Sequence, residues 1–402
     1  MEFLAALAVL LVTAKSIEWA LEKADIHPII AHVLTGVVLG PFALGLINPG
    51  ENLEVLAEFG LIMMMLYMGL TSNFSSIAQN TERATMVAAL GVMFSFLLGF
   101  ATVLAFGKTL TAAVFVGVTL GNTAIEVTSG ILVRERVKRS VYSILMGAAF
   151  ADDIIAVYLI GIVTAMSGGQ LTLSSLGILT VKIFAFIAVI LLVSDRVFKR
   201  AKWFYPVIRN LNVFFTFTMI LTFTLAILAQ WVGLNQIIGA YLAGLTISRL
   251  RERKDPLVVT RIKLNELIED LQVVLTEFFM PLFFIYVGLM FNPPRGSLSL
   301  SLIAALYVSA VLGKLIGCGL GARLLGFSGE DSMVIGIGMG GRGSLELAIL
   351  TFGLRAGLID QSLFASVITV SMLTALTTPV FFRAYLRHLT SGQKLKSRPS
   401  EG

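Results

Sequence analysis

The chain has 402 residues, of which 57% are hydrophobic and 13% are charged, and its formal net charge is +6. A water-soluble protein carries about 25% charged residues, so this composition excludes that class and indicates a helical membrane protein. The single cysteine, Cys318, excludes an internal disulfide framework. Basic residues concentrate in alternate loops, which indicates a membrane-orientation signal and not nucleic-acid binding.

Apolar stretches of about 20 residues, long enough to cross a hydrocarbon core of ~30 Å, recur from end to end. We therefore predict an all-α polytopic membrane protein with about thirteen transmembrane helices. The first apolar run is long and has no small-residue cleavage site after it, so we predict a span there and not a signal peptide. The predicted spans are residues 2–22, 28–46, 53–71, 83–107, 110–132, 140–166, 172–195, 207–230, 233–249, 265–290, 298–323, 331–353 and 360–386.

The loops between these spans predict an orientation. An odd number of spans places the termini on opposite sides, and the basic tail predicts a cytoplasmic C-terminus and an outside N-terminus. The basic loops "VRERVKRS", "RVFKRAKWFYPVIR" and "RLRERKDPLVVTRIK" then fall on the cytoplasmic side. The opposite loops hold little more than Lys108, Arg295 and Arg355. This asymmetry satisfies the positive-inside rule.

Two blocks of the sequence, residues 83–166 and 298–386, have the same pattern of three spans with an interrupted middle span. The interruptions are "TLGNTAIEVTSG", near 120–128, and "GIGMGGRGSLE", near 336–344. Because equivalent helices of the two blocks are offset by seven spans, an odd number, the blocks are predicted to be inverted in the membrane. Inverted repeats with paired interrupted helices are typical of secondary transporters, whose site lies where those helices cross.

Two adjacent carboxylates, Asp152 and Asp153, lie inside the apolar run "MGAAFADDIIAVYLIGIV". Asp153 is thirteen residues past Ser140, which places it ~20 Å into the membrane. Neighbouring positions on a helix diverge by about 100°, so one acid can hold a counter-ion while the other faces a cavity. Two carboxylates this close disfavour simultaneous ionisation, as a site that exchanges a proton for a cation requires. The alternative is a pair that only neutralises a basic residue.

Lys314, in "SAVLGKLIGCGLGA", is the predicted counter-ion of Asp152. It lies nine residues before Arg323, or ~14 Å from that end of the span. Snorkelling to the interface is the alternative, but that depth exceeds the reach of a lysine side chain.

Arg342 and Glu346 are spaced i,i+4 and are predicted to share a helix face as an internal ion pair, with a direct ionic role as the alternative. In the other interruption, Asn122 and Thr123 favour free backbone carbonyls that coordinate a cation. Glu126 is either a third acid of the site or a partner of a basic residue such as Arg342. Four further charged residues within spans are predicted to be less central: Lys15, Glu18, Lys182 and Glu277.

Several of these segments resemble the monovalent cation:proton antiporter family 2, in particular its electrogenic, NapA-like sodium/proton members. The most specific are "FADDIIAV", "LGKLIG" and "RGSLEL". Similar but less specific are "HPIIAHVLTGVVLGP", "LAEFGLIMMMLYMGL", "GLNQIIGAYLAGLTISR" and "EFFMPLFFIYVGL". The resemblance covers nearly the whole chain and implies a multi-pass protein of a prokaryotic inner (plasma) membrane with the sodium/proton antiporter fold.

The resemblance also implies residue roles. Asp153 would be the main carboxylate for Na⁺ and H⁺, Asp152 would accompany it at the cation and pair with Lys314, and Thr123 would lie in the unwound segment that contributes coordination. There are two departures. Glu126 replaces a small or neutral residue, and in "RGSLEL" the acid comes four residues after the arginine, where some members have it two after.

The family further implies a mobile core domain and a dimer domain in a homodimer. The expected parts are 1–82 (dimer domain), 83–166 (core), 167–200 (linker helix), 201–297 (dimer domain), 298–390 (core) and 391–402 (cytoplasmic tail).

We therefore expect secondary active, electrogenic exchange of Na⁺ (or Li⁺) for H⁺, without a cofactor. A K⁺/H⁺ antiporter of the same fold is one alternative, although the Kef branch carries large nucleotide-binding domains that this sequence lacks. A cation channel is another, because acids at mid-membrane also line pores. An enzyme finds little support: the three histidines, His27, His32 and His388, form no HExxH motif, and there is no CxxC.

Overall fold

In the computed structural model, the described residues are all helix, turn or irregular backbone, with no strand among them. They comprise 3–23, 26, 28–71, 81–123, 137–167, 210–232, 236–249, 259–294 and 296–396, and isolated positions between 177 and 208. Seven helices in this part of the chain are long and apolar enough to cross a membrane, and three shorter apolar helices accompany them. The predicted all-α class is thus confirmed; the seventh predicted span, 172–195, lies largely outside the described residues.

Contacts divide the chain into two compact units. The first unit comprises Met1–Ala20, Ala31–Gln79 and Val157–Asn292, and the second comprises Leu21–Ile30, Asn80–Ala156 and Pro293–Gly402. Helices mainly of the first unit are α1 (Phe3–Glu22), α2 (Pro28–Leu39), α3 (Glu51–Thr71), α11 (Leu211–Trp231), α12 (Gln236–Ser248), α13 (Val259–Val274), the π-helical turn η2 (Leu275–Phe279) and α14 (Met280–Leu289). Those mainly of the second are α5 (Thr81–Ala105), α6 (Leu110–Gly121), α8 (Arg139–Ser167), α15 (Leu300–Leu324), α16 (Gly329–Gly338), α17 (Ser344–Arg355) and α18 (Gln361–Lys396).

The ends of three predicted spans are wrong. The helix predicted over 28–46 ends at Leu39, because Gly40 and Pro41 follow and proline restricts the residue before it. The helix predicted to start at 265 begins at Val259, in a charged amphipathic stretch whose low hydropathy indicates a loop. The last helix continues beyond the predicted end at 386, to Lys396, so the first half of the predicted polar tail, 391–396, is helical.

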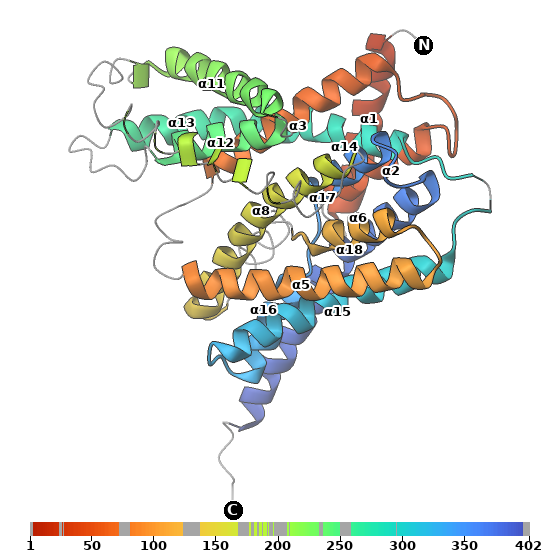
Figure 1. The fold of residues 1–402 in the computed structure, drawn as a ribbon, viewed down its shortest axis with the longest axis vertical. Helices are drawn as coiled ribbons and strands as arrows, with labels where there is room; N and C mark the ends of the chain where they lie inside the picture. Colours follow the sequence, from red (N-terminus) through yellow and green to blue (C-terminus); the bar gives the residue numbers. More distant parts are fainter. Residues whose placement is uncertain are drawn as a thin grey trace, which may run out of the picture. The chain divides into compact units, whose positions relative to one another are not determined.

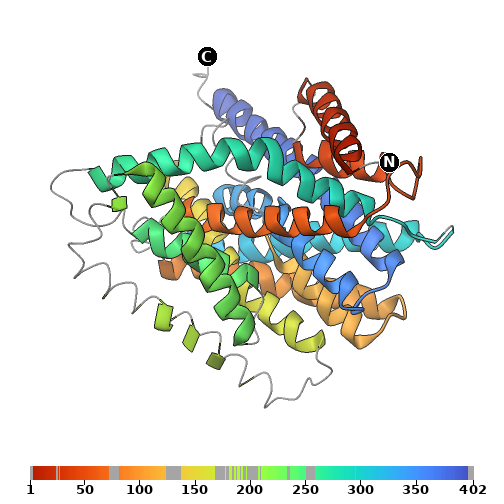
Figure 2. The ribbon, with the colours of Figure 1, turned by 90° about the horizontal axis from the view of Figure 1, so that it is seen from above.

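In the first unit, α3 lies alongside the continuous helix formed by α13, η2 and α14 (Figure 2). Glycines let the helices cross closely at two places. A Cβ on Gly69 of α3 would lie 2.9 Å from the Cα of Gly244 on α12, and a Cβ on Gly288 of α14 would lie 2.9 Å from the Cα of Gly36 on α2.

The two crossings carry related sequences, "YMGL" at 67–70 with "LAG" at 242–244, and "YVGL" at 286–289 with "LTG" at 34–36. The first unit therefore contains an internal repeat of its own, which the sequence analysis did not predict.

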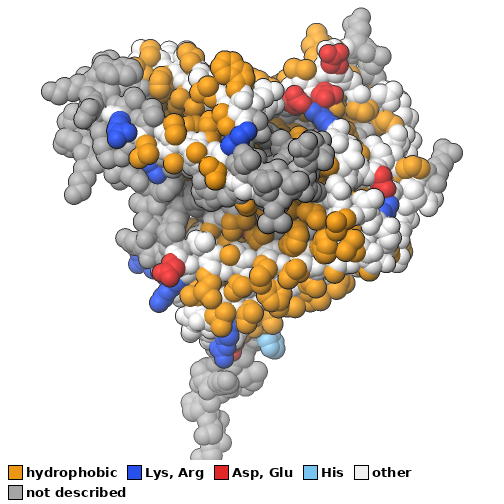
Figure 3. Space-filling model, viewed as in Figure 1, with side chains coloured by type: hydrophobic (Ala, Val, Ile, Leu, Met, Phe, Trp, Pro, Cys, Tyr) orange, Lys and Arg blue, Asp and Glu red, His pale blue; other side chains and the backbone are white. Residues whose placement is uncertain are grey.

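In the second unit, α5 and α15 lie side by side (Figure 1). They are equivalent helices of the two predicted repeat blocks, and the Thr102 and Ser309 hydroxyls join them at 2.7 Å. On the face shown in Figure 3, hydrophobic side chains dominate the described surface and charged ones are few. Met93 and Leu97, both on α5, are 44% and 50% exposed. Such outward-facing apolar side chains fit a surface in contact with lipid.

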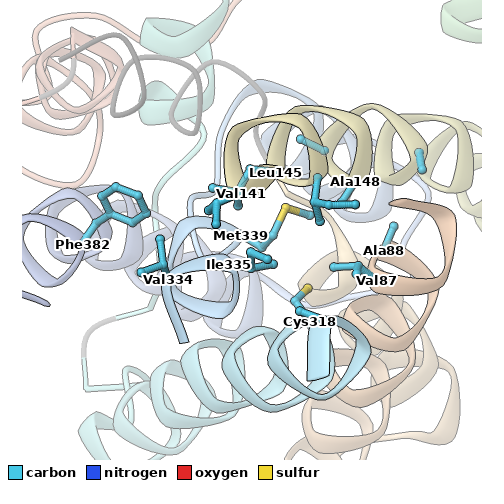
Figure 4. Packing of buried hydrophobic residues seen from close by; sticks show 14 residues of the cluster. Val87, Ala88, Val141, Leu145, Ala148, Cys318, Val334, Ile335, Met339 and Phe382 are labelled. Atoms are coloured by element: carbon cyan, nitrogen blue, oxygen red, sulfur yellow. The ribbon is translucent and has the colours of Figure 1, made fainter. Parts of the chain in front are cut away.

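The core of the second unit is an apolar cluster that draws on α5, α8, α15, α16 and α18 (Figure 4). Its members include Ala148 on α8, Cys318 on α15 and Met339, which follows α16. Asp152 comes one helical turn after Ala148, and Lys314 one turn before Cys318. Since residues four apart lie on one helix face, the packing that fixes this cluster also fixes the position of the two charged side chains.

Candidate ion-binding site

The end of one helix and the interruption between two others meet in the second unit. Helix α6 ends at Gly121, and Asn122 continues in an extended conformation, φ −80° and ψ 149°. Helix α16 ends at Gly338 and α17 begins at Ser344, so residues 339–343 form the other interruption. The Thr123 hydroxyl donates a hydrogen bond to the Met339 carbonyl oxygen at 3.1 Å. The two interruptions that the sequence predicts are thus adjacent; the rest of the first, including Glu126, lies outside the described residues.

Asp152 and Lys314 form a fully buried ion pair beside these interruptions. Lys314 Nζ lies 2.9 Å from Asp152 Oδ2, and the side chains are 1% and 0% exposed. Within the described residues Asp152 Oδ1 has no hydrogen-bond partner. The predicted pair is therefore present in the structure. Asp153 lies in α8 in the next position, but its side chain is outside the described part of the chain.

Glycine at position 91 brings α5 against Lys314. A Cβ there would overlap Cys318 Sγ and lie 3.8 Å from Lys314 Nζ. The ammonium group consequently has a backbone wall on one side and Asp152 on the other. Removing one member of a buried ion pair costs roughly 3–5 kcal/mol because the other charge is left uncompensated, so each side chain depends on the other for its place in the core.

Arg342 and Glu346 form a second buried pair, with Nη1 and Oε1 3.3 Å apart. Arg342 lies in the interruption before α17, so the prediction that both residues share a helix face is wrong: the glycine-rich segment leaves the helix before Arg342. The pair still forms because the side chain reaches into the first turn of α17. Arg342 Nη2 also lies 3.5 Å from the Ala310 carbonyl oxygen, one turn before Lys314.

Further buried polar atoms surround the two pairs. Asn122 and Thr123 are 3% and 1% exposed. Asn122 Oδ1, Arg342 Nε and Glu346 Oε2 lack hydrogen-bond partners within the part of the chain that the structure describes. Carboxylate and amide oxygens are the ligands that hard cations prefer. The described site can thus offer uncharged and charged oxygens to a small cation, with Lys314 and Arg342 balancing the carboxylates.

The remaining charged residues singled out by sequence lie elsewhere. Lys182 is exposed, and its Nζ lies 3.4 Å from the Val232 carbonyl oxygen. Lys15, Glu18 and Glu277 form a separate group in the first unit. His32 also belongs to this group, through Glu18. It lies fourteen residues after Glu18 in the sequence and on a different helix, so no helical spacing predicts this contact.

A break in a membrane helix, close to the end of another helix and to buried ion pairs, is typical of secondary transporters. The chain belongs to the sodium/hydrogen exchanger (transmembrane) family, whose model matches residues 6–387.

Known proteins support this assignment over the whole length. The chain is 30% identical over 353 residues to the Na⁺/H⁺-K⁺ antiporter GerN of Bacillus cereus, covering 87% of this chain and 88% of GerN. It is 28% identical over 399 residues to a Na⁺/H⁺ antiporter of Enterococcus hirae, covering 96% and 99% of the two chains. The structure of the sodium proton antiporter MjNhaP1 from Methanocaldococcus jannaschii matches with a TM-score of 0.71 over 95% of each chain, at 16% identity. This last likeness shows the fold.

Proposed function

We propose that this protein is a secondary active antiporter that exchanges Na⁺ (or Li⁺) for H⁺ across the membrane. The observation that carries the proposal is the buried Asp152–Lys314 pair at 2.9 Å. It is adjacent in sequence to Asp153, and it belongs to the same unit as the end of α6 and the interruption between α16 and α17. The relatives named above as Na⁺/H⁺ antiporters support the same reaction. The exchange needs no cofactor, because the ion gradients supply the free energy.

In this mechanism Asp153 is the carboxylate for which protons and cations compete. A cavity open to one side lets Na⁺ displace the proton, and oxygens of Asp152, Asn122 and Thr123 replace the lost water. The neutralised site can then pass the dry barrier, which an isolated carboxylate crosses only at a prohibitive free-energy cost. Release on the far side accompanies reprotonation. Arg342 and Glu346 keep the interrupted segment in place.

We also assign a role in transport to each of the two units. The second unit, which contains every described site residue, is the moving transport domain, and the first is the scaffold through which two copies form a homodimer. The protein lies in the inner membrane of a prokaryote with its C-terminus in the cytoplasm and its N-terminus outside, since the basic loops then fall on the cytoplasmic side.

The site assignment is tested in proteoliposomes by the dissipation of a pH gradient on addition of Na⁺. Asp153→Asn removes the titrating group without changing its size, so we expect exchange to fall to the background of empty liposomes while the protein remains folded. Asp270→Asn, at an exposed position of helix α13, is the matched control and should exchange as the wild type does. Retained Na⁺/H⁺ exchange in Asp153→Asn would refute the assignment.

A K⁺/H⁺ antiporter is the second candidate, because GerN carries K⁺ in its name as well as Na⁺. The same assay with Na⁺, Li⁺ and K⁺ side by side decides between them. A response to Na⁺ and Li⁺ alone supports the first proposal, and a response to K⁺ alone supports the second. Saturation with cation concentration and dependence on a proton gradient separate either antiporter from a channel.

A further inference from the structure

Helix α5 contains a buried hydroxyl group close to Lys314. Ser95 is completely buried, and its Oγ has no hydrogen-bond partner among the described residues. Other buried hydroxyls of the same unit donate to the carbonyl oxygen four residues earlier in their helix, as those of Thr119 and Thr351 do. A buried hydroxyl without a partner costs free energy, and proteins accept such costs mainly at functional sites.

Ser95 lies against the turn of α15 that carries Lys314. A Cβ on Gly313 would lie 2.5 Å from the Ser95 Cα and 2.7 Å from its Oγ, so the hydroxyl faces the residue directly before Lys314. The lysine side chain lies against the same face of α5, because its Nζ is 3.8 Å from the position of a Cβ on Gly91. Residues 91 and 95 are one helical turn apart and share that face. The hydroxyl and the lysine nitrogen therefore lie against neighbouring turns of α5.

The inverted repeat makes Ser95 the counterpart of Lys314. Each is fourteen residues from the start of its helix, and both helices have 25 residues. Gly91 faces Cys318 of α15. Four residues further along α5, Ser95 faces Gly313, which comes earlier in α15, so the two helices run antiparallel. Equivalent positions of an antiparallel pair face each other only at the centre of the crossing, and Ser95 and Lys314 lie there.

The proposed function gives the hydroxyl of Ser95 a partner. Lys314 Nζ is bonded to Asp152 Oδ2 at 2.9 Å. When Na⁺ takes an oxygen of Asp152, the lysine loses this partner inside the protein. A serine hydroxyl accepts a hydrogen bond from an ammonium group and donates one to a neutral amine, so Ser95 can pair with Lys314 in either protonation state. A buried amine without any partner would oppose the binding of Na⁺.

We propose that Ser95 is a positioning residue of the transport site, whose hydroxyl pairs with Lys314 when Na⁺ separates this lysine from Asp152. The inference rests on the proposed function. Ser95 then favours the Na⁺-bound state, and it destabilises the arrangement in which Lys314 is paired with Asp152 and the hydroxyl is unpaired. These two effects have opposite signs, and a serine that only packs α5 against α15 would not produce both.

The first test measures how exchange in proteoliposomes depends on Na⁺ concentration. Ser95→Ala removes one oxygen atom and keeps the close approach of the helices, so we expect the variant to fold. The loss of one hydrogen bond in the Na⁺-bound state should raise the Na⁺ concentration for half-maximal exchange by about three- to tenfold, while the maximal rate stays close to that of the wild type.

The matched control for this test is Ser332→Ala. Ser332 Oγ is also buried and without a partner in the part of the chain that the structure describes. Its residue lies on α16 against Gly319, more than one turn beyond Lys314. Ser332→Ala should therefore show the same Na⁺ dependence as the wild type.

The second test uses melting temperatures in detergent and does not depend on transport. With choline in place of Na⁺, Ser95→Ala removes an unpaired hydroxyl and should melt at least as high as the wild type. Na⁺ stabilises a protein that binds it, and this rise in melting temperature should be smaller in Ser95→Ala at equal Na⁺ concentration. A lower melting temperature of Ser95→Ala without Na⁺ would overturn the proposal, because the hydroxyl would then support the fold itself.

Direct coordination of Na⁺ by Ser95 is distinguished by removing the lysine. In a Lys314→Ala background the partner of the hydroxyl is absent, so Ser95→Ala should change the effect of Na⁺ on exchange and melting by less than twofold. If Lys314→Ala does not fold, Asp152→Asn is added to remove the uncompensated carboxylate. An undiminished effect of Ser95→Ala in this background would overturn the pairing with Lys314.

The outcomes also separate this inference from the proposed function. Na⁺/H⁺ exchange with unchanged Na⁺ dependence in Ser95→Ala would leave the proposed function in place and remove the role of Ser95. A wild type that exchanges no Na⁺ for H⁺ would refute the proposed function, and the role of Ser95 with it.

Discussion

At the scale of single residues, the second unit contains a lysine and an aspartate that are almost completely removed from solvent. The exposed fractions of Lys314 and Asp152 are 1% and 0%. Each charge is tolerated because the other lies 2.9 Å away. The energetic consequence is asymmetric: the loss of one partner is far more costly than the loss of both.

We therefore predict that Asp152→Asn and Lys314→Met each destabilise the protein by roughly 3–5 kcal/mol, and that the double variant recovers a large part of that loss. Thermal unfolding in detergent measures this as two strongly lowered melting temperatures and one intermediate value. Lys182→Met, at an exposed lysine, is the control and should melt like the wild type. Additive losses in the double variant would show that the two side chains do not stabilise one another.

The sequence predicts this pair but not all of the site. Asp153 and Lys314 can be placed at mid-membrane depth by counting residues along apolar spans, because a helix rises by a fixed ~1.5 Å per residue. The same counting misplaces Arg342, since i,i+4 spacing assumes a helix that the glycines interrupt. His32 is missed for another reason: its partner lies on a different helix, and periodicity along one helix carries no information on such contacts.

At the scale of elements, apolar length predicts that helices exist but does not fix where they end. The early end of α2 at Leu39 depends on Gly40 and Pro41, and the start of α13 at Val259 depends on packing of an amphipathic stretch. Close crossings are likewise decided by single positions. At the crossing of α5 and α15, a Cβ on residue 91 would overlap Cys318 Sγ.

This geometry predicts that a second substitution restores the stability and exchange lost in a first one. Gly91→Ala should lower stability by about 1–3 kcal/mol, as overpacking does, and should also weaken exchange by displacing the turn that carries Lys314. Cys318→Ala removes the sulfur atom in question, so Gly91→Ala combined with Cys318→Ala should regain both.

The control for this pair is Gly329→Ala, at the start of α16, where a Cβ meets no atom within 4 Å. The melting temperature and the exchange rate are measured for Gly91→Ala, Cys318→Ala, the double variant and Gly329→Ala. A Gly91→Ala defect that persists in the Cys318→Ala background would mean that another contact, and not the sulfur, limits the approach of the helices.

At the scale of the whole molecule, the grouping of Asn80–Ala156 with Pro293–Gly402 in one unit explains how side chains far apart in the sequence form one site. The sequence indicates that these two ranges belong together only through their repeated pattern of interrupted spans, because neither block alone indicates that it packs against the other. The internal repeat of the first unit is visible only once Gly69 lies against Gly244 and Gly36 against Gly288, since the shared letters are too few to stand out.

The last prediction concerns the charge that the whole molecule moves in one cycle. Asp152 is paired with Lys314, and Asp153 is the next residue in the chain. In the proposed cycle Na⁺ displaces the proton of Asp153 and separates Lys314 from Asp152, and the ammonium group of Lys314 then releases a second proton, so two protons leave for each Na⁺ that enters. One cycle then moves a net charge. A sudden Na⁺ jump on proteoliposomes adsorbed to a solid-supported membrane should evoke a transient current in the wild type, and none in Asp153→Asn.

Lys314→Ala tests whether Lys314 contributes to the net charge that moves in each cycle. Without the ammonium, only the proton on Asp153 is exchanged for each cation, so the current should fall more than the Na⁺-driven pH change, which is measured in the same liposomes. The ratio of current to pH change, and not either value alone, is therefore the decisive quantity, because it is insensitive to the amount of folded protein. A wild type that moves protons on a Na⁺ jump but gives no current would show an electroneutral exchange of one proton per cation, and Lys314 would then act only as the structural counter-ion of Asp152.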